Sequence, residues 1–141
     1  MKILKLIAAI LLGALMIAGG VGHHTNKAMI MAFIPDFLPW RVFLNYASGI
    51  LEIVLGIGIL IPAYRQQCAK YIVILLILLL PIHLVDVLRE QPIIGSTQAA
   101  IIRIPFQLLF ILMGWFVSRG EPRRNSDRNG GKKTETARPK V

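Results

Sequence analysis

The chain has 141 residues, a formal net charge of +9 and 55% hydrophobic residues. The apolar residues lie in long blocks and do not alternate with charge, a pattern that is typical of a membrane protein and excludes an ordinary soluble globule. The lone cysteine, Cys68, excludes an intramolecular disulfide, a CxxC redox pair and a thiolate metal site.

Four apolar blocks cover approximately residues 3–21, 42–62, 70–88 and 98–118. A helix rises about 1.5 Å per residue, so a block of ~20 residues matches the ~30 Å hydrocarbon core of a bilayer. We therefore predict an all-α polytopic membrane protein, with a bundle of four transmembrane helices over residues 1–118.

The first block begins like a secretory signal, with a basic start and an apolar centre. Its long apolar run and the absence of a convincing small-x-small cleavage site favour a retained first helix. Ala9, Gly13, Ala14 and Ala18 are spaced along this helix for close approach to a neighbour.

The connection to the second span reads "HHTNKAMIMAFIPDFLPWR". Residues 28–34 are apolar but too few to cross a bilayer, which predicts a short interfacial segment between the first two spans. Pro35 and Pro39 are expected to end this segment, and Trp40 to anchor the turn into the second span.

Polar residues recur on one face of the second span. Ser48, Glu52 and Gly56 follow one another at intervals of four, and Asn45 lies close to the same stripe. Helices in a bilayer associate through small residues and buried polar contacts. Glu52 is therefore predicted to face the bundle.

The third span is almost uniformly apolar until Pro81, which removes an amide donor and is expected to kink the helix. His83 and Asp86, three residues apart, share one face beyond the proline.

The fourth span carries Arg103, Gln107 and Gly114 on one face. Pro105 is expected to act like the proline of the third span, unless it falls in the first turn of the helix.

Residues 119–141 have no apolar periodicity and carry eight basic and three acidic residues. This pattern predicts a disordered basic tail, which either contacts anionic lipids or serves only as a topology signal. With both termini in the cytoplasm, twelve lysines and arginines lie inside and four outside. The positive-inside rule favours this orientation.

In this orientation the polar side chains of the spans all fall in the outer half of the membrane, which predicts one polar pocket there. Ionisable residues at such depth cost about 2.5–3.5 kcal/mol each and are functional candidates. Arg103 is expected to pair with Glu52 or Asp86, and a purely structural network that locks the helices is the alternative. The pocket candidates are His23, Asn45, Ser48, Glu52, His83, Asp86, Arg103 and Gln107.

Recognised catalytic and cofactor motifs are missing from the sequence. His23 and His24 lack the spacing of metal ligands, and the chain has no phosphate loop, catalytic triad, haem attachment motif or dinucleotide fingerprint. We predict no metal, no intrinsic cofactor and no specific nucleic-acid partner, and the lack of an autonomous catalytic or redox-cofactor motif favours a protein that is not an enzyme.

The motifs "GVGHH", "IPDFLPW", "YASGILEIVLGIGILIP", "LLLPIHLVDVL" and "RIPFQLLFILMGW" appear in an order that resembles the small bacterial DoxX-like family of four-helix membrane proteins. The resemblance covers about residues 1–118 and is most specific around Ser48, Gly49, Glu52 and Gly56, in register with the upstream proline pair. It places His23 at the family's histidine, whereas His83 stands where relatives commonly have asparagine.

The name of that family comes from a subunit associated with thiosulfate:quinone oxidoreduction. The resemblance therefore implies an accessory protein of the bacterial cytoplasmic (inner) membrane, in a redox or quinone-linked complex. The predicted pocket suits a quinone, with apolar walls for its ring and tail and His83, Asp86 or Arg103 for its carbonyl oxygens, or else another amphipathic molecule or a partner helix. Two alternatives stay open: a small proton-coupled carrier with Glu52 as its relay, and a non-catalytic assembly protein. The sequence leaves the oligomeric state undetermined.

Overall fold

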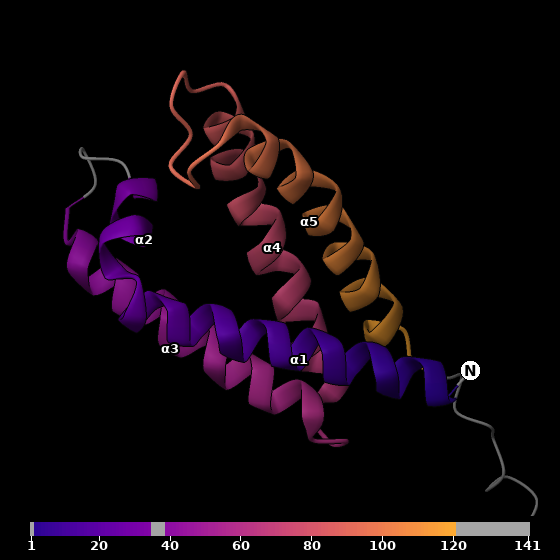
Figure 1. Cartoon of the computed structure of the whole chain (residues 1–141). Helices are drawn as coiled ribbons and strands as arrows, with labels where there is room; N and C mark the ends of the chain where they lie inside the picture. The colour runs from indigo at the N-terminus through magenta and orange to yellow at the C-terminus, as the bar shows by residue number, and fades with distance from the viewer. Residues whose placement is uncertain (1, 35–38, 121–141) are drawn as a thin grey trace, which may run out of the picture.

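The computed structural model of the chain describes residues 2–34 and 39–120 (Figure 1). The described part is all-helical, and four of its helices are long and apolar enough to cross a membrane. The predicted fold class is confirmed: this is a multi-pass helical membrane protein. The helices are α1 (Lys2–Thr25), α2 (Lys27–Phe33), α3 (Arg41–Leu60), α4 (Arg65–Val87) and α5 (Thr97–Ser118).

Two helices extend past one end of their apolar blocks, because helical hydrogen bonding continues into polar flanking residues. α1 runs to Thr25, so His23 and His24 belong to its last turn. α4 begins at Arg65, ahead of the apolar block that starts near residue 70. The predicted interfacial segment is helical, as α2. The predicted break at Pro35 and the predicted disorder of residues 121–141 lie outside the described residues.

The four long helices form two pairs. α1 packs mainly along α3, and α4 packs mainly along α5. The pairs meet at the end of the bundle that carries the start of α1 and the end of α5, and they diverge at the end that carries α2 (Figure 1). We call these the closed end and the α2 end.

An apolar core fills the closed end. It draws on all four long helices, and Leu12, Ile59 and Ile72 are completely buried in it. None of its members is polar, as expected for the dry half of the predicted bundle. The buried residues of the core are Ala8, Ala9, Leu12, Met16, Leu55, Ile59, Ala69, Ile72, Leu76 and Val117.

Glycines allow α1 and α3 to touch backbone to backbone. A Cβ atom on Gly20 would lie 2.5 Å from the carbonyl oxygen of Gly49, and one on Gly56 would lie 2.9 Å from that of Gly13. No real side chain tolerates such distances, so the pair depends on these residues. Of the small residues predicted to line the interface, Ala14 and Ala18 are exposed instead, because the contact stripe runs through glycines.

Both prolines lie inside helices. α4 continues through Pro81, and Pro105 is well past the first turn of α5, which starts at Thr97. The first-turn alternative for Pro105 is therefore excluded.

The junction between α2 and α3 is held by a side chain. Arg41 Nη2 donates a hydrogen bond of 2.6 Å to the carbonyl oxygen of Met31. Trp40 adopts a left-handed conformation with φ 59°, which a non-glycine residue rarely takes, and its side chain is exposed. The predicted anchor at the start of α3 thus sits at the surface of the α2 end.

Candidate functional site

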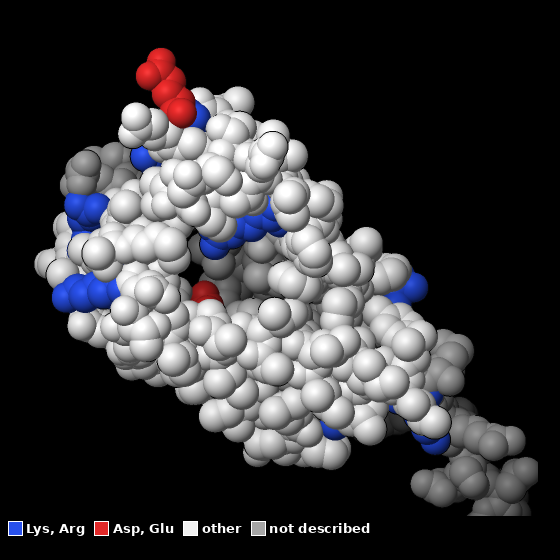
Figure 2. Space-filling model, viewed as in Figure 1, with Lys and Arg blue, Asp and Glu red and all other residues white. Residues whose placement is uncertain are grey.

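A cavity of about 380 Å³ lies between the two helix pairs at the α2 end. Figure 2 shows it as a hollow on the side of the bundle, with acidic atoms on its α1–α3 side and basic atoms on its α4–α5 side. Pockets for small ligands usually measure about 300–1,000 Å³. The hollow is therefore large enough for a small molecule, and its opening faces sideways, where a bilayer would lie.

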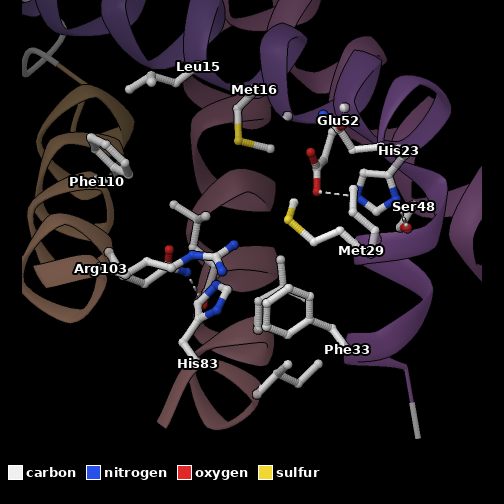
Figure 3. A pocket seen from close by; sticks show the side chains of 18 of the residues that line it. Leu15, Met16, His23, Met29, Phe33, Ser48, Glu52, His83, Arg103 and Phe110 are labelled. Carbon is white, nitrogen blue, oxygen red and sulfur yellow. Dashed lines mark hydrogen bonds and ion pairs between the residues drawn. The ribbon is translucent and has the colours of Figure 1, made fainter. Parts of the chain in front are cut away.

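Most of the cavity wall is apolar. α1 supplies Leu15 and Met16, α2 supplies Met29 and Phe33, and α5 supplies Phe110 (Figure 3). The sequence analysis expected apolar walls but did not name the residues that form them, although the apolar stretch 28–34 was the signal for the part that α2 supplies.

The polar part of the wall comes from residues that the sequence singled out. Six of the eight predicted site residues line the cavity: His23, Ser48, Glu52, His83, Arg103 and Gln107. Asn45 and Asp86 are buried but do not line it. The cavity therefore brings together polar groups from α1, α3, α4 and α5.

Glu52 and His23 form one polar pole of the cavity. Glu52 Oε1 lies 3.4 Å from His23 Nε2 (Figure 3). A Cβ atom on Gly19 would come within 2.6 Å of Glu52 Oε2, so the absence of a side chain there makes room for the carboxylate. Glu52 thus faces the bundle, as predicted.

The predicted ion pair of Arg103 with Glu52 or Asp86 is not formed within 4.0 Å, although the charge of Asp86 acts on Arg103. Among the described residues, the one ion pair within 4.0 Å joins Glu52 to His23. Glu52 belongs to the α1–α3 pair and Arg103 to the α4–α5 pair, and the cavity separates the two.

A hydrogen-bonded cluster fixes the orientation of His23. Its Nδ1 lies 2.9 Å from the carbonyl oxygen of Asn45, 3.2 Å from Asn45 Oδ1 and 3.2 Å from Ser48 Oγ. Asn45 Nδ2 donates back to the carbonyl oxygen of His23 at 3.0 Å, and Ser48 Oγ donates to the Asn45 carbonyl at 3.0 Å. Asn45, completely buried, therefore supports the site from behind the imidazole.

Arg103 and His83 form the opposite pole. In the described structure, Arg103 Nη1 and His83 Nδ1 are buried without a hydrogen-bond partner. The ring of Phe33 lies 5.1 Å from Arg103 Cζ and 6.4 Å, edge-on, from the His83 ring. Figure 3 places this pole across the cavity from Glu52 and His23, with Phe33 and Met29 between. Buried polar atoms are nearly always satisfied, so these two nitrogens, like Asp86 Oδ2, are exceptions within the described structure.

Two other predicted residues have structural contacts. Gln107 Nε2 donates a buried hydrogen bond of 3.0 Å to the Leu76 carbonyl and so ties α5 to α4. Asp86 is 1% exposed, and its Oδ1 accepts a 2.8 Å hydrogen bond from the amide of Ile93. Asp86 therefore holds the α4–α5 connection instead of lining the pocket.

His24 does not join His23 at the cavity. Its ring packs against Tyr46 with a centroid separation of 5.2 Å, and it does not line the cavity. Within residues 2–34 and 39–120, no three His, Cys, Asp or Glu side chains gather as metal ligands would.

No curated protein and no solved structure matches the sequence significantly. Residues 12–118 match a domain of unknown function, DUF8561. The matched segment covers more than half of the chain and contains every residue of the cavity wall. The chain belongs to the DUF8561 family.

Proposed function

We propose that the protein is an accessory integral membrane protein that binds a small amphipathic molecule in the cavity between its helix pairs. The observation that carries this proposal is an apolar cavity with buried, unpartnered polar atoms, Arg103 Nη1 and His83 Nδ1, at one pole. An unpaired buried donor costs about 1–3 kcal/mol, which a ligand acceptor would relieve.

A quinone is the ligand that we propose first. Its ring and tail suit walls of leucine, methionine and phenylalanine, and its carbonyl oxygens accept hydrogen bonds of the kind that Arg103 donates. The resemblance to the DoxX-like family points to the same class through a redox or quinone-linked complex. Electron transfer would need a cofactor carried by a partner, since the protein side chains described above supply none.

The bacterial cytoplasmic membrane, with both termini in the cytoplasm, is the proposed location. The excess of lysine and arginine on that side supports this orientation. The cavity then opens in the outer half of the bilayer, where a membrane-dissolved ligand has access without crossing water.

Two observations favour a binding protein over a carrier and over a purely structural protein. A carrier needs access from both sides, whereas the closed end is packed with ten buried apolar residues. A purely structural network needs satisfied polar contacts, whereas Arg103 makes no hydrogen bond to another described residue.

The test is mass spectrometry of the lipids and quinones that co-purify with the full chain in native nanodiscs. We expect a quinone with the wild type and its loss in Glu52→Gln, with the exposed Glu90→Gln as the matched control. Absence of any bound small molecule from wild type and variants alike, with partner proteins still present, would favour the assembly role.

A further inference from the structure

We propose that His23 and Glu52 hold one exchangeable proton between Nε2 and Oε1, and that the molecule bound in the cavity gives this proton to the pair or takes it. This inference rests on the proposed ligand-binding function and adds the chemistry that the site performs on its ligand. It requires a ligand with a hydroxyl group of the phenol or quinol type.

The surroundings of His23 Nδ1 determine its tautomer. The Asn45 carbonyl, 2.9 Å away, can only accept a hydrogen bond. Asn45 uses its amide nitrogen on the His23 carbonyl, so the side-chain oxygen is the atom that faces the ring. Ser48 uses its hydroxyl proton on the Asn45 carbonyl, which leaves lone pairs toward the ring. Three acceptors around Nδ1 require that Nδ1 carries a proton.

The other ring nitrogen therefore determines the protonation of the pair. With Nδ1 protonated, a neutral imidazole presents the lone pair of Nε2 to the Glu52 carboxylate, 3.4 Å away. Two lone pairs facing each other repel, whereas one added proton turns the contact into an attraction. The proton sits either on Glu52, facing a neutral imidazole, or on His23, facing a carboxylate.

The remaining groups around the cavity do not complete this pair. α5 supplies Arg103 and Gln107, and α4 supplies His83, but none lies within ion-pair or hydrogen-bond distance of Glu52. α2 adds no ionisable side chain to the wall, and its Lys27 instead lies over the Tyr46 ring at 5.3 Å. Glu52 and His23 consequently exchange their proton with each other or with whatever occupies the cavity.

The step is a proton transfer without electron transfer by the protein. When the pair lacks the extra proton, the O–H bond of the ligand hydroxyl breaks and a bond forms to Glu52 or to His23 Nε2. The ligand keeps the electron pair as an oxyanion, and Arg103 Nη1 at the opposite pole supplies a positive charge within the same cavity. The reverse step returns the proton to the ligand oxygen.

Nitrogen-15 NMR of histidine-labelled full-length protein in nanodiscs shows, without any ligand, which ring nitrogens of His23 carry a proton. We expect His23, assigned by its loss in His23→Gln, to carry a proton on Nδ1 at every pH at which the protein is folded. Glu52→Gln should change the Nε2 signal and leave Nδ1 unchanged, because the Asn45 cluster is intact in that variant. A neutral His23 with its proton on Nε2 would overturn the proposal.

The ultraviolet spectrum of a bound short-chain quinol, ubiquinol-1, tests the exchange, because a proton that passes from the ligand to the pair leaves an oxyanion whose absorption differs from that of the neutral quinol. We expect the spectrum of the oxyanion in the wild type and in His24→Gln, and that of the neutral quinol in His23→Gln. Quinol binding to the wild type with the spectrum of the neutral quinol alone would refute the exchange and leave the binding function standing. Failure of the quinol to bind would refute both the quinol exchange and the quinone assignment, and the NMR result would still decide whether the pair stores a proton.

Discussion

The carboxylate of Glu52 lies 3.4 Å from the imidazole of His23, although Glu52 sits on α3 and His23 in the last turn of α1. The contact is possible because Gly20 and Gly49 bring the two backbones together one turn away. Glu52 therefore finds its partner inside its own helix pair. The cationic Arg103, on the other pair, is left to face the cavity.

Moving the Glu52 carboxylate without removing it should weaken ligand binding. In Gly19→Ala the new methyl group would meet Glu52 Oε2 at 2.6 Å, so the carboxylate has to shift away from its present position. We expect at least a tenfold loss of bound quinone in native nanodiscs, equivalent to about 1.4 kcal/mol. Adding Glu52→Asp, which shortens the side chain, should restore part of the binding; an unaffected single variant would contradict the assigned position of Glu52.

Replacing Arg103 should separate a ligand site from a structural network. Arg103→Leu removes a half-buried cation that makes no ion pair within 4.0 Å to a described residue, so the free energy of unfolding in mixed micelles should change by less than about 1 kcal/mol. Ligand co-purification should be lost at the same time. A drop in stability of more than about 1 kcal/mol would show that Arg103 locks the helices.

Asp86 should behave in the opposite way. Asp86→Ala removes the acceptor for the Ile93 amide, and the loss of a buried hydrogen bond costs about 1–3 kcal/mol of unfolding free energy. Asp86→Asn keeps an acceptor oxygen and should be closer to the wild type. Because Asp86 does not line the cavity, correctly folded Asp86→Asn is expected to retain its ligand.

The contact between α1 and α3 predicts a sharp difference between two neighbouring glycines. In Gly20→Ala the added Cβ would clash with the Gly49 carbonyl at 2.5 Å, whereas in Gly22→Ala the nearest atom, on Ile30, is 4.0 Å away. We expect Gly20→Ala to lower the free energy of unfolding by about 1–3 kcal/mol. Gly22→Ala should be neutral or stabilising, because alanine favours the helix. Equal effects of the two changes would mean that the helices do not touch at Gly20.

The fold could be predicted from the sequence, because the thickness of a bilayer sets the length of each apolar block. The inward-facing side of each helix could be predicted as well. Glu52, Arg103 and Gln107 all point inward, as their spacing with small residues predicted. Both signals are local, since they depend on residues within one helix.

The partners of the charged side chains could not be predicted from the sequence in this way. Which helices lie side by side at the α2 end depends on the packing of the whole bundle, and spacing within α5 says nothing about the distance from Arg103 to Glu52. The roles of Asn45 and Asp86 were hidden for the same reason. Both looked like pocket residues, yet Asn45 orients an imidazole and Asp86 holds a loop.

The closed end holds the two helix pairs together, and at the α2 end they stand apart. Its buried apolar side chains join the two helix pairs, the glycine contacts hold α1 against α3, and Phe33 reaches Arg103 and His83 at the α2 end. The width of the cavity therefore depends on the separation of the two helix pairs at the α2 end. A molecule bound between the poles would fix that separation, so the shape of the α2 end would differ between the filled and the empty cavity.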